Sequence, residues 1–80
     1  MNIGIYRQYL QEYVSEAIHN SDGSIFQIRE NLASVQIGRF VLRHKQEKTR
    51  ALYDAQSAFD EHRHWPLDII LSHLGVQVPE

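Results

Sequence analysis

Apolar residues recur every three or four positions near the start of this chain, between residues 3 and 19. Polar and charged residues fill the positions between them, so a helix built from this segment is apolar along one side. The pattern stops at residues 20–23, where short polar side chains and a glycine favour a turn. The spacing therefore predicts an amphipathic helix over residues 3–19. Its apolar side is made of Ile3, Tyr6, Leu10, Tyr13, Val14, Ala17 and Ile18.

The second predicted helix begins at Ser24. Ser24 and Gln27 have the spacing of a capping box, in which two side chains satisfy free backbone N–H groups at a helix start. Apolar residues at helical spacing then run from Ile25 to Leu42. The pattern predicts a long helix with two adjacent apolar stripes, and we expect it to be central in a bundle or to contact two partners.

A β-hairpin over residues 25–42 is the alternative for the same segment. Several of its apolar residues, Val35 and Ile37 among them, also alternate at a period of two, and Glu30-Asn31 would form the turn. Good helix formers in the segment and the lack of a strong hairpin turn dipeptide favour the helix.

A third helix is predicted to extend to about residue 63. Leu52, Ala55 and Phe59 form a narrow apolar stripe, flanked by further alanines. Small alanine side chains on this side would let another helix approach closely.

Pro66 and Gly75 delimit a short fourth helix over residues 66–75. Proline suits the first position of a helix, and glycine commonly follows the last one. Asp68 in the first turn places a negative charge at the positive end of the helix dipole. The predicted fold class is therefore all-α, a small bundle of three to four helices forming one domain over residues 1–80. An α+β fold with the hairpin at 25–42 is the alternative.

Length and composition limit how such a bundle can be stabilised. The chain has 80 residues and no cysteine, which rules out disulfides and thiolate metal sites. A domain of this size buries only about 60% of its unfolded surface, so we expect good helix packing or a partner chain to support it. No apolar run approaches the roughly 20 residues of a membrane span. The absence of cysteine and of a recognisable signal peptide favours a cytoplasmic protein.

Catalytic and metal-binding patterns are weak. The four glycines are isolated, so no phosphate-binding loop is predicted. His62 and His64 are the nearest approach to a metal site, but an i, i+2 pair at a helix end need not share a face. We therefore expect a chain that is not an enzyme and has no cofactor, metal or small-molecule substrate.

The surplus of apolar surface on the second predicted helix indicates a contact with another protein. The leading hypothesis is a non-enzymatic protein-interaction module, such as a small regulator, adaptor or subunit, that acts as a homodimer or bound to a larger protein. The predicted contact residues are Tyr9, Ile25, Phe26, Ile37, Phe40, Val41 and Trp65.

A nucleic-acid-binding regulator is the alternative function. The net charge of the chain is −2, yet basic residues gather between positions 39 and 50. Phosphate contacts from such residues dominate affinity for nucleic acids. The predicted nucleic-acid-binding residues are Arg39, Arg43, Lys45, Lys48 and Arg50.

Overall fold

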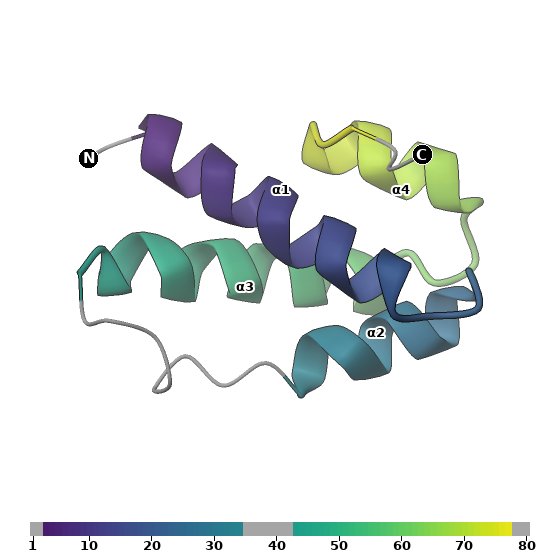
Figure 1. The fold of residues 1–80 in the computed structure, drawn as a ribbon. Helices are drawn as coiled ribbons and strands as arrows, with labels where there is room; N and C mark the ends of the chain where they lie inside the picture. Colours follow the sequence, from purple (N-terminus) through teal and green to yellow (C-terminus); the bar gives the residue numbers. More distant parts are fainter. Residues whose placement is uncertain (1–2, 35–42, 78–80) are drawn as a thin grey trace.

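The computed structural model describes residues 3–34 and 43–77, and within these ranges it contains helices and no strand. The helices are α1 (Ile3–His19), α2 (Ile25–Ala33), α3 (Lys45–Glu61) and α4 (Leu67–Leu74). Figure 1 shows α3 in the middle, with α1 and α4 above it and α2 below it in this view. The all-α prediction is confirmed, and none of these helices is long and apolar enough to cross a membrane.

The ends of the first and fourth helices follow their sequence signals closely. The predicted bounds of α1 are confirmed. At the other end of the chain, α4 begins directly after Pro66 and ends at Leu74, directly before Gly75, which takes a left-handed φ of 77°. The glycine N–H donates to the carbonyl of Ser72 at 3.1 Å, which closes the last turn. The local sequence signals therefore predict the bounds of both helices closely.

Ser24 caps the start of α2 as predicted, although the Gln27 side chain binds the N–H of Asp22 and not that of Ser24. The observed length of α2 differs from the prediction. The Ser24 hydroxyl accepts a hydrogen bond from the Gln27 N–H at 3.2 Å, while the Gln27 side chain accepts one from the Asp22 N–H at 2.8 Å. The helix then ends at Ala33, so the prediction of a long second helix is wrong. The hairpin is also wrong, because its proposed turn at residues 30–31 is helical.

Two side-chain amides tie α2 to its neighbours. Asn31 of α2 donates to the carbonyl of Ala17 in α1 at 2.9 Å, and Gln56 of α3 donates to the carbonyl of Leu32 in α2 at 2.9 Å. The second bond satisfies one of the carbonyls that a helix end leaves without an intrahelical partner. Tertiary contacts thus fix where α2 lies and help to end it.

The helix at the centre of the bundle is α3. The sequence pattern had instead favoured a central position for the segment from residue 25. Its buried side is rich in alanine, as predicted, and α1 packs along it. Small side chains allow this close approach, while larger residues from every helix fill the remaining space. The largest fully buried side chains are Phe59, Ile28, Leu32, Ile70, Leu71 and Val14.

Candidate interaction surface

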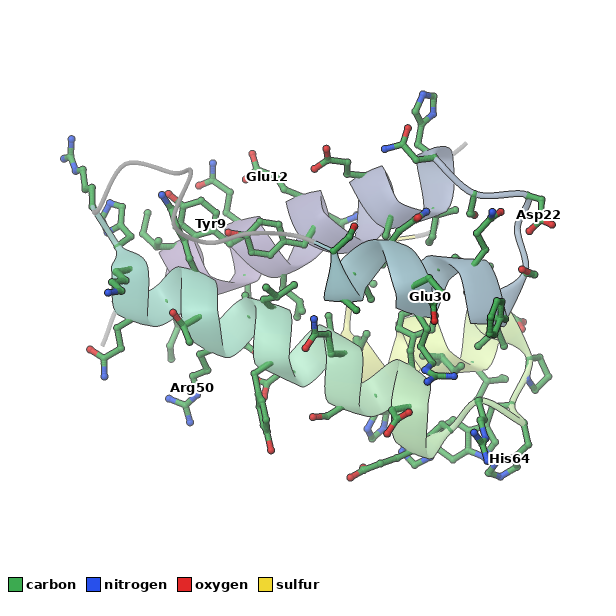
Figure 2. All side chains as sticks on the ribbon, turned by 90° about the horizontal axis from the view of Figure 1, so that it is seen from below. Tyr9, Glu12, Asp22, Glu30, Arg50 and His64 are labelled. Atoms are coloured by element: carbon green, nitrogen blue, oxygen red, sulfur yellow. The ribbon has the colours of Figure 1, made fainter. Side chains whose placement is uncertain are left out.

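One groove runs between α2 and α3 on the outside of the bundle. We call it, together with the residues that edge it, the α2–α3 face. It comprises Phe26, Arg29, Glu30 and Ala33 of α2 and Tyr53, Gln56, Ser57 and Asp60 of α3. All of these except Phe26 line the groove, which has a volume of about 290 Å³. Figure 2 looks onto both helices, with Glu30 on the side of α2 toward α3 and Arg50 on the side of α3 away from α2.

Exposed aromatic side chains lie toward the two ends of this face. The two helices run antiparallel, since Arg29 pairs with Asp60 while the carbonyl of Leu32 binds Gln56. Phe26 lies one turn before Arg29 and is 67% exposed. Tyr53 lies beside Ala33 at the other end and is 68% exposed. Aromatic side chains are enriched at protein–protein interfaces, so these two residues are candidates for a contact.

Three polar side chains between the two aromatic residues, Arg29, Asp60 and Gln56, are paired with one another or with the backbone. Arg29 Nε lies 3.2 Å from a carboxylate oxygen of Asp60, and Gln56 holds the end of α2. Each of these contacts joins the two helices. The groove is therefore a surface of mixed polarity with an aromatic residue near either end.

The other described residues that were predicted to contact a partner lie against the core. Ile25, Tyr9 and Trp65 are half-buried and pack on the central apolar cluster. The Tyr9 ring stacks on Tyr13 with ring centres 6.0 Å apart, and Trp65 stacks on His62 at 3.7 Å. Of the predicted contact residues in the described ranges, Phe26 is the exposed one. Ile37, Phe40 and Val41 lie outside the described residues.

The basic residues divide between surface and interior at the start of α3. Arg43, Lys45 and Arg50 are exposed, whereas Lys48 is only 4% exposed and its ammonium group lies 5.2 Å from the centre of the Tyr9 ring. This geometry is a cation–π contact inside the bundle, so Lys48 is not presented to a phosphate backbone. Arg39 lies outside the described residues.

A hydrogen bond between α1 and α3 lies near this basic region. The Tyr6 hydroxyl donates to a carboxylate oxygen of Asp54. Burial, together with the hydrogen bond and the negative charge of Asp54, raises the pKa of Tyr6 to about 12. A tyrosine that stays protonated in this way serves as a donor that fastens two helices.

The histidines near the α3–α4 turn surround Trp65. His62 stacks flat on the indole with an interplanar angle of 7°, and His73 meets both rings edge-on. His64 contacts the indole with ring centres 6.2 Å apart. Within residues 3–34 and 43–77, no group of three or more His, Cys, Asp or Glu side chains could hold a metal ion. The cluster packs the turn between the two helices.

Sequence reasoning missed Tyr53 and the polar pairs of the face. The neighbours of Tyr53 one helical turn away are all polar, and it lies outside the apolar stripe of α3, so helical periodicity gives no reason to select it. These neighbours are Thr49, Arg50, Gln56 and Ser57. The sequence signal that could have identified Tyr53 is its position as a single aromatic residue on the polar side of the predicted helix. The pairing of Arg29 with Asp60 spans two helices and follows only from their packing.

Comparisons of this chain with protein-family models, with curated proteins and with solved structures found no significant match.

Proposed function

We propose that this chain is a non-enzymatic protein-interaction module that binds its partner through the α2–α3 face. The observation that carries the proposal is the exposure of Phe26 and Tyr53 toward opposite ends of one groove. Aromatic side chains are enriched among residues that dominate binding energy, because they bury a large area at a low cost in conformational entropy. A cytoplasmic location, which the lack of cysteine favours, belongs to the same proposal.

The shape of the groove supports a macromolecular partner over a small ligand. Its volume of about 290 Å³ is at the lower limit of small-molecule sites, which usually span about 300–1,000 Å³ and enclose most of the ligand. The flanking aromatic residues stand out from the surface and do not line an enclosed cavity. A second helix laid along the groove would cover both of them.

The polar chemistry of the face supports a binding role over a catalytic one. Arg29 and Asp60 neutralise each other, and Gln56 is engaged by a backbone carbonyl. A catalytic nucleophile or base needs a partner that activates it and a site for the reacting atom. Arg29, Asp60 and Gln56 instead hold the two helices together.

An affinity capture with matched variants tests this function. The bait proteins are the wild type, the double variant Phe26→Ser/Tyr53→Ser, and the control Ile69→Ser, whose target on α4 is 48% exposed. All three are incubated with nuclease-treated lysate, after circular dichroism has shown equal helix content. We expect the wild type and the control to retain the same proteins, and the double variant to lose them. Equal retention by all three baits would contradict the proposal.

Nucleic-acid binding remains a second candidate, supported by the exposed cations at the start of α3. Arg7 of α1 adds to them, because it lines a small pocket together with Arg50. Asp54 lies in the same pocket and reduces the positive field there. The candidate predicts an affinity for duplex DNA or RNA that falls steeply with salt and is lost in Arg43→Glu/Arg50→Glu. An absence of binding to duplex DNA or RNA at low salt would rule this function out.

A further inference from the structure

The outward stripe of α2 has a symmetric spacing. Phe26, Arg29, Glu30 and Ala33 follow one another at intervals of three, one and three residues, which places them on one side of the helix. The midpoint of the stripe falls between Arg29 and Glu30. A second copy of α2 laid antiparallel about this midpoint would place residue 26 against 33 and residue 29 against 30.

The side chains at these positions complement one another when the stripe is paired with itself. The protruding ring of Phe26 would meet the small exposed side chain of Ala33, and Arg29 would meet Glu30. Each contact occurs twice in a pair related by a two-fold axis, as isologous interfaces require. We infer that the partner of the α2–α3 face is a second copy of this chain, docked antiparallel through α2. This inference rests on the function proposed above.

Tyr53 completes the receiving site for the aromatic ring. It lines the groove together with Ala33, so a Phe26 ring from the second copy would enter between the two. Aromatic rings that meet at an offset or edge-on attract each other beyond the gain from the area that they bury. The exposure of both aromatic residues in the single chain is explained by this pairing.

The charged pair at the centre can form without breaking the existing ion pair. The contact of Arg29 with Asp60 uses the Nε atom. A guanidinium group has five N–H donors, so the terminal nitrogens of Arg29 can reach a carboxylate of the second copy. Glu30 is exposed, and its side chain lies on the same side of the helix. The interface thus places Arg29 of each copy opposite Glu30 of the other copy, once on each side of the two-fold axis.

The contact through α2 is small for a stable dimer. A nine-residue helix is only about 13 Å long, while a stable interface buries roughly 800 Å² on each partner. The paired helices alone cover less than that, so the dimer forms at high concentration and dissociates on dilution. Self-association is therefore a concentration-dependent property of this chain.

Sedimentation velocity over about a hundredfold range of protein concentration tests the inference. We expect the wild type to shift from monomer to dimer, and Glu30→Arg to remain monomeric because the introduced guanidinium would face Arg29 of the second copy. The triple variant Arg29→Glu/Glu30→Arg/Asp60→Arg keeps an ion pair between α2 and α3, restores the complementary pairs across the axis and should dimerise again. Ala33→Arg, which fills the receiving site, should stay monomeric, whereas Ser72→Arg on α4 adds the same charge and should dimerise like the wild type.

Two outcomes would overturn the inference. One is a wild type that stays monomeric at every concentration, and the other is a dimer that neither Glu30→Arg nor Ala33→Arg weakens. If the wild type is monomeric but capture from lysate still depends on Phe26 and Tyr53, the proposed function stands and only the identity of the partner is wrong. If neither self-association nor capture depends on the face, both proposals fail.

Discussion

Replacement of Phe26 by serine should leave the folding stability of the monomer nearly unchanged. Phe26 is 67% exposed, so only about a third of its surface is covered in the folded chain. Complete burial of a phenylalanine side chain is worth about 1.5–3 kcal/mol. The loss in Phe26→Ser should therefore be about 0.5–1 kcal/mol, since serine and phenylalanine have similar helix propensities.

Phe59→Ala provides the matched comparison within the core. Phe59 is fully buried in α3, and truncation of such a residue costs about 3–5 kcal/mol because a cavity remains. A domain of 80 residues has a total stability of about 4–12 kcal/mol. The core variant should thus lose much of the free energy of unfolding, while the surface variant should keep nearly all of it.

Urea unfolding at low protein concentration measures both changes. Trp65 is the single tryptophan and packs against the core, so its fluorescence reports on the folded bundle. A loss above about 2 kcal/mol in Phe26→Ser would contradict the exposed placement of this residue, because it would show that Phe26 is packed inside the folded monomer. In that case Phe26 would not belong to a contact surface.

Three further predictions concern the bundle itself. Because the pKa of Tyr6 is raised in the folded chain, the unfolded chain loses the Tyr6 proton first, and the free energy of unfolding that this residue contributes below pH 10 is lost as the pH rises toward 12. Tyr6→Phe, which cannot ionise or bind Asp54, should reduce this loss when urea unfolding is compared at pH 8 and pH 11. Gly75→Ala should lower stability by about 1 kcal/mol, because φ is 77° and the new Cβ would lie 3.3 Å from Arg7 Nη1; an unchanged thermal midpoint would contradict this. Ser24→Ala should cost about 1 kcal/mol by removing the cap of α2, and an unaltered unfolding curve would show that the cap contributes nothing.

The parts of the fold that the sequence predicts are those that depend on local chemistry. The amphipathic period gives α1, and Pro66 with Gly75 gives α4. The end of α2 depends on its neighbours, because Gln56 of α3 binds a carbonyl near the end of α2. Apolar residues continue at helical spacing beyond Ala33, so periodicity alone overestimates the length of this helix.

The candidate surface was less predictable, since exposure depends on packing. Phe26 and Ile25 are adjacent and both apolar, yet one is exposed and the other lies against the core. Lys48 belongs to a basic run in the sequence, but its side chain lies over the Tyr9 ring. Tyr53 sits on a polar side of α3, where an apolar periodicity gives no signal. Only the relative placement of α2 and α3 brings the residues of the face together.

The most direct test of self-association through α2 is a dilution series followed by two-dimensional NMR of the ¹⁵N-labelled wild type. We predict that backbone amide signals of residues 26–33 and of Tyr53 shift with concentration and return to their monomer positions on dilution, while those of α4 stay fixed. Shifts confined to α4, or no change at any concentration, would contradict self-association through this helix.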